Sequence, residues 1–182
     1  MIYHLTPHES IEIVNSDALT LEVEGTWAPD GAPPPMHFHP AQAERFALLE
    51  GVLRARVDGV EHELTEGDTL EVPAGAVHQM WNEGDVPARA TWRTEPAGRT
   101  AEWFAELDAL RRHGRVGKDG MPGPLAFGAY LTEYSDVIRL SGPQPLVRSI
   151  LRILAVLGRL RGYRPGSGPR RFREEPLGSG GE

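Results

Sequence analysis

Apolar and polar residues alternate with a period of two in several short stretches before residue 98. Leu19–Glu24 alternates in this way, which is typical of a strand with one buried face. Leu70–Val72, Val77–Trp81 and Arg89–Thr94 are further short runs of strand-forming residues, and glycines and prolines separate them. Short strands at this spacing predict a mainly β first half that folds as a sandwich or barrel.

Asp58-Gly59 lies between two apolar runs and predicts a two-residue hairpin turn. The turn fixes the pairing of Val52–Val57 with Val60–Leu64. In this register Ala55 faces His62 on an otherwise apolar face. The other face carries two cross-strand pairs of opposite charge, which are Arg54 with Glu63 and Arg56 with Glu61.

The apolar spacing changes beyond residue 98 from that of strands to that of helices. It predicts helices at residues 100–112 and 144–162, and we also assign the more ambiguous residues 125–135 to a helix. We therefore expect a barrel domain at residues 1–98, a helical extension at residues 99–165 and a disordered tail at residues 166–182. The tail assignment rests on its content of glycine, proline and arginine.

The composition of the 182 residues, with 40% hydrophobic and 25% charged residues, is that of an ordinary globular protein. The chain contains no cysteine, so disulfides and thiolate chemistry are excluded and any metal must bind to nitrogen or oxygen. The residues after Met1 form neither a basic nor an apolar leader segment, which favours a cytoplasmic protein over a secreted one.

Charge is distributed unevenly along the chain. Residues 1–100 carry a net charge of −11 and residues 101–182 a net charge of +4, which together give −7 for the whole chain. Between Val137 and Arg173 there are nine arginines and no acidic residue. The arginine-rich helix at 144–162 can therefore cover the barrel or a dimer seam, or lie on an anionic membrane surface. We do not expect it to bind nucleic acid, because the chain is acidic and aromatic residues do not interleave with its arginines.

Two runs of the sequence combine histidine, glutamate, glycine and proline at fixed spacings. The first consists of Gly31, His37, His39, Glu44 and Gly51, and the second of Gly67, Pro73, Gly75, His78 and Asn82.

Strand geometry places some of these side chains together. His37 and His39 are two residues apart, so they project from the same face of a strand. Glu44 lies an odd number of residues after His39, so in an unbroken strand its side chain would point to the opposite face. Pro40 interrupts the strand and allows a bend that brings Glu44 inward. A barrel can then bring His78 beside them from a distant strand. Three neutral imidazoles and one carboxylate suit a divalent Fe, Mn, Co, Ni, Cu or Zn ion and leave coordination positions for water, O₂ or substrate.

The two runs resemble both halves of the cupin signature, and the chain is similar over residues 15–95 to single-domain (monocupin, cupin_2-like) members of that superfamily. The resemblance implies a jelly-roll β-barrel followed here by a small α-helical C-terminal region. It also implies a homodimer, and metal ligands at His37, His39, Glu44 and His78. The helical half has no counterpart in the family pattern, so the resemblance implies nothing about its role.

Further residues are candidates for the walls of a cavity around such a metal. Phe46, Leu48, Met80 and Trp92 are expected to line an apolar pocket, although they could equally fill the barrel. His62 lies on the apolar face of its hairpin, so it could act in catalysis as a proton relay or simply lie at the rim.

The sequence thus supports two hypotheses about function. The first is a metal-dependent enzyme that acts on a small organic molecule, by dioxygenation or by isomerisation or decarboxylation. The second is a non-catalytic module that binds or senses a small molecule, with its basic amphipathic C-terminal helix contacting a partner or a membrane surface.

Overall fold

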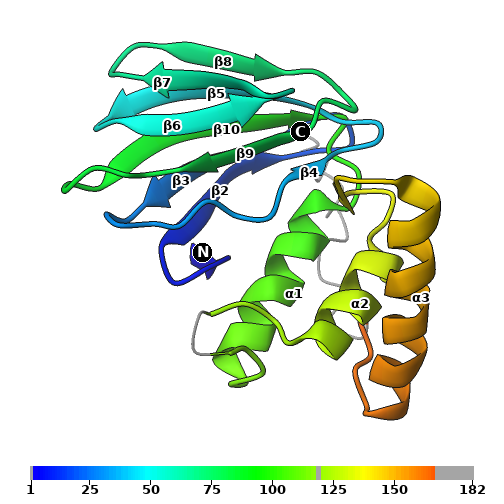
Figure 1. Cartoon of the computed structure of the whole chain (residues 1–182). Coiled ribbons are helices and arrows are strands. Elements are labelled where there is room, and N and C mark those ends of the chain that lie inside the picture. Colours follow the sequence, from blue (N-terminus) through cyan, green and yellow to red (C-terminus); the bar gives the residue numbers. More distant parts are fainter. Residues whose placement is uncertain (1, 118–119, 167–182) are drawn as a thin grey trace, which may run out of the picture.

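The computed structural model describes residues 2–117 and 120–166, which form a two-sheet β-barrel with a layer of helices against it (Figure 1). The strands are β1 (Ile2–His4), β2 (Glu9–Ser16), β3 (Leu21–Trp27), β4 (His37–Phe38), β5 (Ala43–Glu50), β6 (Leu53–Val57), β7 (Val60–Leu64), β8 (Thr69–Val72), β9 (His78–Trp81), β10 (Ala88–Glu95) and β11 (Arg139–Leu140). The helices are α1 (Thr100–Arg112), α2 (Pro124–Glu133) and α3 (Gln144–Leu160). The expected mainly β fold with a helical C-terminal region is confirmed.

The strands form two antiparallel sheets. One sheet has six strands in the order β1-β2-β3-β10-β5-β8, and the other has five in the order β11-β4-β9-β6-β7. Buried and exposed residues alternate along β3, β5 and β10, so each of these strands presents one face to the interior. On β5 the buried residues are Glu44, Phe46 and Leu48, as the bend at Pro40 predicts. The predicted interruption of the strand at Pro40 is observed, because β4 ends at Phe38 and β5 begins only at Ala43.

The hairpin of β6 and β7 has the predicted register. Ala55 pairs with His62, and Arg54 and Arg56 pair with Glu63 and Glu61. Asp58 and Gly59 have φ angles of 47° and 84°. Both residues therefore adopt the left-handed conformation that a tight two-residue hairpin turn requires.

Two strands near the N-terminus, β1 and β2, were not singled out by the alternation of residues. β2 lies between β1 and β3 in the six-stranded sheet. The pairing of β2 with β3 is irregular between Ile13 and Asn15, and Val14 is exposed. This irregularity interrupts the period of two on which the sequence prediction depends.

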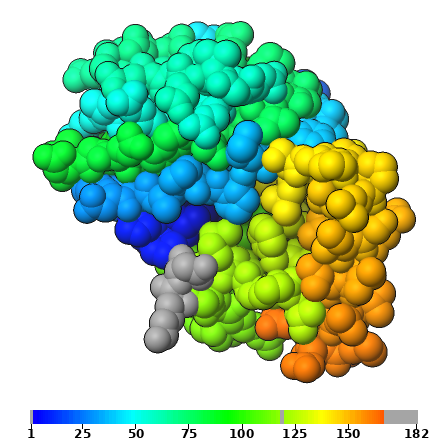
Figure 2. All heavy atoms as spheres, in the orientation of Figure 1, coloured from blue at the N-terminus to red at the C-terminus, as the bar shows by residue number. Residues whose placement is uncertain are grey.

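The helices lie together at one side of the barrel, with α3 outermost (Figure 1). α1 has the predicted bounds, and α2 and α3 confirm the other two helices to within two residues. In the space-filling view the helical layer lies directly against the strands (Figure 2). Trp103, Phe104, Leu131 and Tyr134 from this layer belong to the same hydrophobic core as the barrel interior, so the core continues across residue 98.

Two sequence expectations concern the remaining parts of the chain. Most of the expected tail at 166–182 lies outside the described residues. Within the described ranges, no helix combines the length and the apolar character needed to cross a membrane.

Candidate metal centre and cavity

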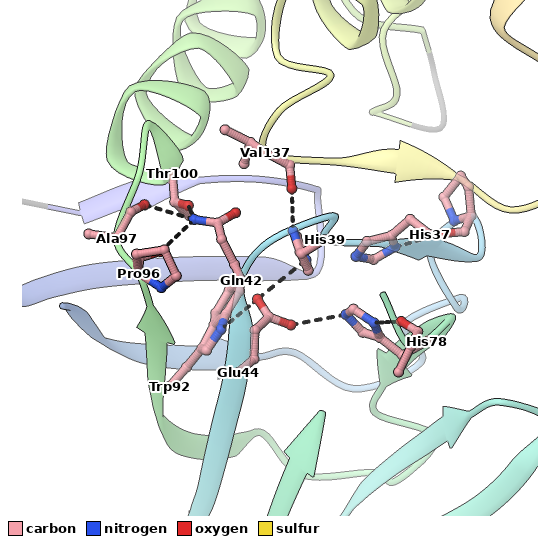
Figure 3. Close-up of polar contacts among 12 residues, drawn as sticks. His37, His39, Gln42, Glu44, His78, Trp92, Pro96, Ala97, Thr100 and Val137 are labelled. Atoms are coloured by element: carbon pink, nitrogen blue, oxygen red, sulfur yellow. Dashed lines mark hydrogen bonds and ion pairs between the residues drawn. The ribbon is translucent and has the colours of Figure 1, made fainter. Parts of the chain in front are cut away.

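The three histidines of the two sequence runs converge between the sheets (Figure 3). His37 on β4 pairs directly with His78 on β9, and His39 follows β4 in the chain. One ring nitrogen from each histidine lies within 4.8 Å of those of the other two. Their ring centroids are 4.5 to 5.3 Å apart. The structure therefore forms a histidine cluster that is compatible with one metal ion.

Each of these rings is oriented by a main-chain carbonyl. The Nδ1 atom of His37 lies 2.9 Å from the Pro35 oxygen, and that of His78 lies 3.0 Å from the Ala76 oxygen. The Nδ1 atom of His39 lies 2.7 Å from the oxygen of Val137, which follows α2. Since a carbonyl only accepts hydrogen bonds, Nδ1 must carry the proton in all three rings. Since Nδ1 of each ring contacts the main chain, the Nε2 atoms are the candidate metal-binding atoms, and the helical region itself supplies one of the three carbonyls.

Glu44 enters the cluster from β5 in the opposite sheet. Its Oε1 atom lies 3.3 Å from Nε2 of His39, and its Oε2 atom lies 3.0 Å from Nε2 of His78. The indole Nε1–H of Trp92 donates a hydrogen bond of 3.0 Å to Oε1 (Figure 3). The carboxylate is therefore held against the same two nitrogen atoms that the carbonyls leave free.

The charges of the cluster depend on one another. Burial, together with His78 and His39, lowers the pKa of His37 to about 3, so this ring is neutral near pH 7. Burial alone would raise the pKa of Glu44, but His39 and His78 lower it to about 2. Burial likewise opposes the charged form of His78, but the Glu44 carboxylate outweighs it and raises the pKa of that ring. The centre thus combines an ionised carboxylate with at least one neutral imidazole.

Two buried atoms of the cluster lack a hydrogen-bond partner among the described residues. They are Nε2 of His39 and Oε2 of Glu44. Both side chains are almost completely buried, with 7% and 1% of their surface exposed. Leaving a buried polar atom without a hydrogen bond is costly, and here both atoms make only ion-pair contacts within the cluster, His39 Nε2 with Oε1 of Glu44 and Oε2 of Glu44 with His78 Nε2. Nitrogen and oxygen donors of this kind fit a divalent transition metal.

A hydrogen-bonded glutamine connects this centre to the helical layer. Nε2 of Gln42 lies 2.7 to 2.9 Å from the carbonyl oxygens of Pro96 and Ala97 and from the hydroxyl of Thr100 (Figure 3). Gln42 precedes Glu44 by two residues, and Thr100 begins α1. The start of α1 is therefore tied to the strand that carries the carboxylate.

A cavity opens from the histidines toward the helices. The space inside it is about 920 Å³, a volume that includes open solvent at its mouth. Most of its lining is apolar and much of it is aromatic. The lining residues other than the metal cluster are Leu5, Thr6, Glu9, Trp27, Pro34, Pro35, Phe46, Met80, Trp92, Trp103, Phe104, Leu107, Met121, Pro122, Phe127, Leu131, Ile138 and Leu140.

The structure separates the predicted pocket residues into two groups. Phe46, Met80 and Trp92 line the cavity. Leu48 is buried in the core but is not part of the lining, and His62 is half-buried on β7 and also lies outside it. His62 is therefore not brought to the metal cluster, because β7 is the edge strand of its sheet.

The sequence analysis missed Glu9, the other carboxylate that lines the cavity. Glu9 has the same parity on β2 as Ile11, which is buried, so the alternation of β2 would have indicated an inward carboxyl group. Burial and the negative charge of Glu44 raise the pKa of Glu9 to about 7. A carboxyl group of this kind can exchange a proton near neutral pH.

We expect the raised pKa of Glu9 to make the stability of the metal-free protein depend on pH. The folded state favours the uncharged carboxyl group of Glu9, and this preference stabilises the fold fully below about pH 4.5. The stabilisation is lost as the pH rises through about 7. The free energy of unfolding, compared with that of Glu9→Gln, should therefore fall by about 3 kcal/mol over this range. Urea unfolding at several pH values measures the difference.

Glu12→Gln is the matched control for the Glu9 substitution, because it removes one carboxylate from an exposed position on the same strand. A difference between wild type and Glu9→Gln that stays constant from pH 4.5 to pH 8 would contradict the prediction.

Comparison with known proteins relates the barrel to one family. The family model described as "Cupin domain" matches residues 23–93. The "Tetracenomycin polyketide synthase protein TcmJ" of Streptomyces glaucescens is 32% identical over 90 residues, which cover 50% of this chain and 54% of that protein. The "Probable oxidoreductase virH" of Hypocrea virens is 32% identical over 145 residues, which cover 72% of this chain and 65% of that protein. The matched part of this chain thus covers less than two thirds of the length of each of these relatives.

A solved structure shows the same fold. It is an RmlC-like cupin from Shewanella frigidimarina, with a TM-score of 0.50 and 21% sequence identity over 56% of this chain and 87% of that chain. The match covers a little over half of this chain.

Proposed function

We propose, on the premise that residues 23–93 of this chain are a cupin domain, that the protein is a metal-dependent enzyme acting on a small, largely apolar molecule. His37, His39, Glu44 and His78 would hold one divalent transition metal. The observation that carries this proposal is the convergence of three imidazoles and the buried Glu44 carboxylate at the end of an aromatic cavity. Bound at this position, a metal would supply Lewis-acid chemistry and, if redox-active, access to O₂.

The residues of the chain have distinct roles in this proposal. Trp92, Phe46 and Phe104 form an aromatic wall, since Trp92 stacks on Phe46 with ring centroids 5.3 Å apart and meets the edge of Phe104 at 5.1 Å. Such a wall orients a flat ring by stacking and keeps water away from it. Glu9 would take or give a proton on the bound molecule.

The aromatic lining favours a substrate class. We infer an aromatic or polycyclic compound that carries hydroxyl or keto oxygens, because its rings would contact the walls while an oxygen reaches the histidine end of the cavity. The name of one relative, a polyketide synthase protein, is compatible with a substrate that carries keto oxygens, and that of another, a probable oxidoreductase, with redox chemistry. Oxygen-dependent chemistry of the dioxygenase type is the first candidate reaction, and isomerisation or decarboxylation is the second.

The proposal predicts metal-dependent turnover. Protein purified without chelators and reloaded with Fe, Mn, Ni, Co, Cu or Zn is mixed with a panel of phenols, naphthols and diketones. We expect at least one compound to be converted by the metal-loaded protein and not by the metal-free protein, as measured by mass spectrometry of products and by an oxygen electrode. Oxygen uptake indicates dioxygenation, while conversion without oxygen uptake indicates isomerisation or decarboxylation.

Two results would contradict the enzyme proposal. If the protein neither contains nor accepts any of these metals, the metal centre is wrong. If the metal-loaded protein binds compounds of the panel tightly but converts none of them, the barrel is a binding module and not an enzyme.

A further inference from the structure

The outermost helix, α3, leaves many large apolar side chains exposed. Leu146, Ile150, Ile153, Leu157 and Leu160 are between 46% and 80% exposed, and Val156 beside them is 58% exposed. We call these six residues the α3 stripe. Isolated exposed apolar residues are common on protein surfaces, but a continuous set of six along one helix is typical of an interaction site.

The orientation of α3 is fixed by close packing on α2. A Cβ atom at Gly158 would lie 2.4 Å from the Leu125 carbonyl oxygen, and one at Gly128 would lie 2.4 Å from Cβ of Leu154. The two helices therefore touch at their glycines, and Ala155 is buried in the same contact. Rotation of α3 to bury the stripe within the chain would break this packing. The stripe thus faces away from α2, on the helix that lies outermost in the helical layer (Figure 1).

The spacing of the stripe is that of a helix–helix seam. Its five main residues lie 4, 3, 4 and 3 positions apart. This is the repeat by which one helix packs along another. The two ends of the stripe are equally far from Ile153, with Leu146 seven residues before it and Leu160 seven residues after it, while Ile150 lies three residues before it and Leu157 four residues after it.

The equal distances from Ile153 to Leu146 and to Leu160 allow the ends of the stripe to pair with each other in a second copy. A two-fold axis through Ile153 would place Leu146 of one chain against Leu160 of the other, and Ile153 against its own copy. We propose that a second copy of this chain covers the stripe, with the two α3 helices packed antiparallel. The proposal does not depend on the metal centre or on the proposed function.

The charged residues of α3 are compatible with this seam. At 100° per residue, Arg148, Arg152 and Arg159 lie roughly 130° around the helix from the middle of the stripe. Arg159 also forms an ion pair with Glu133 of α2, at 3.7 Å. Two copies would therefore meet without burying an unpaired charge, which is the arrangement that a stable interface requires.

The size of the stripe fits a modest dimer interface. With roughly 100 Å² of exposed surface on each side chain, the six residues would contribute on the order of 600 Å² per chain, or about 1,200 Å² per pair. That total lies at the lower end of specific protein interfaces.

The arrangement of the same residues on α3 fits binding to a membrane surface less well. A helix that lies on an anionic bilayer carries its basic residues along the two borders of its apolar face or on its opposite face. Here the face opposite the stripe is packed on α2. Arg148, Arg152 and Arg159 lie on one side of the stripe, and among the arginines of α3 and its C-cap only Arg161 lies toward its other side. The observations therefore favour a second copy of this chain.

Sedimentation of the full-length protein tests the proposal. The chain has a mass of 20.0 kDa, so a dimer would have about twice this mass. We expect wild type to be dimeric at 10 µM and Ile153→Glu to dissociate at least 100-fold more readily. Arg152→Glu is the matched control, because it introduces the same residue at the neighbouring position outside the stripe, and it should remain dimeric. Circular dichroism confirms that both variants are folded.

Disulfide cross-linking tests the antiparallel geometry, because the chain has no cysteine of its own. Ile153→Cys should form a covalent dimer under mild oxidation, since this residue would face its own copy. Leu146→Cys alone should not, but its mixture with Leu160→Cys should cross-link. Cross-linking of Leu146→Cys with itself would overturn the antiparallel arrangement.

Other results would overturn the proposal altogether. They are a wild type that stays monomeric at 100 µM, and an Ile153→Glu variant that remains as dimeric as wild type. Flotation of monomeric wild type with vesicles of 30% phosphatidylserine in phosphatidylcholine would assign the stripe to a membrane surface instead.

Discussion

Replacing both His39 and His78 with alanine should reduce the bound metal from about one ion per chain to below about 0.1. The two substitutions remove two of the three clustered imidazoles and leave His37 and Glu44 as a pair of weak ligands. They also remove both nitrogen atoms that the Glu44 carboxylate approaches. Metal content is measured by mass spectrometry after purification without chelators and after reloading with each candidate metal.

His62→Ala is the matched control for this loss of metal. It removes a half-buried histidine from the same barrel, but from a position on β7 that does not line the cavity. We expect this variant to retain the metal content of wild type. If the double variant binds as much metal as His62→Ala does, the histidine cluster is not the metal centre.

Replacing Trp92 should have the second largest effect, on the stability of the fold. Trp92 is 8% exposed, packs between Phe46 and Phe104, and donates its hydrogen bond to Glu44. Trp92→Ala should lower the free energy of unfolding by about 3 to 5 kcal/mol, because it removes a large buried side chain and leaves a cavity. This is a large part of the 5 to 15 kcal/mol that typically stabilises a domain, so the variant could unfold near room temperature.

Trp92→Phe separates packing from hydrogen bonding. It keeps most of the ring but removes the Nε1–H donor, so it should cost about 1 to 3 kcal/mol through the buried carboxylate that it leaves without this partner. Trp81→Phe is the matched control, because Nε1 of this buried tryptophan has no hydrogen-bond partner among the described residues. Urea unfolding of the three variants in one buffer gives the comparison. Equal losses for Trp92→Phe and Trp81→Phe would show that the hydrogen bond to Glu44 contributes nothing.

The helical region supplies several of the aromatic side chains that line the cavity of this barrel. Trp103, Phe104 and Phe127 come from this region and close the cavity on one side. The carbonyl of Val137 orients His39 from 98 positions along the chain. Arg139 and Leu140 form the short strand β11 that pairs with β4, next to His37. Changes in the helical region are therefore expected to alter the metal centre as well as the cavity.

Local features of the sequence were sufficient to predict much of the barrel. Asp58-Gly59 determined the register of β6 and β7, because a two-residue turn leaves only one pairing of the strands that follow and precede it. The parity of His37 and His39, and the break at Pro40 before Glu44, depend on neighbouring residues alone. The bounds of α1 likewise follow from a change of period that is visible within a few residues.

The tertiary structure alone decided what surrounds the histidines. No local pattern connects Val137 with His39, closes the cavity with α1, or keeps His62 away from the cavity, since each of these depends on how distant segments pack. Glu9 shares the parity of the buried Ile11, but the irregularity after Ile13 interrupts the alternation by which β2 itself would have been predicted. Strand and turn geometry is encoded by neighbouring residues, whereas the packing of helices over a barrel depends on the shape of both surfaces. For this reason the candidate ligands could be named from the chain, whereas the cavity around them followed only from the fold.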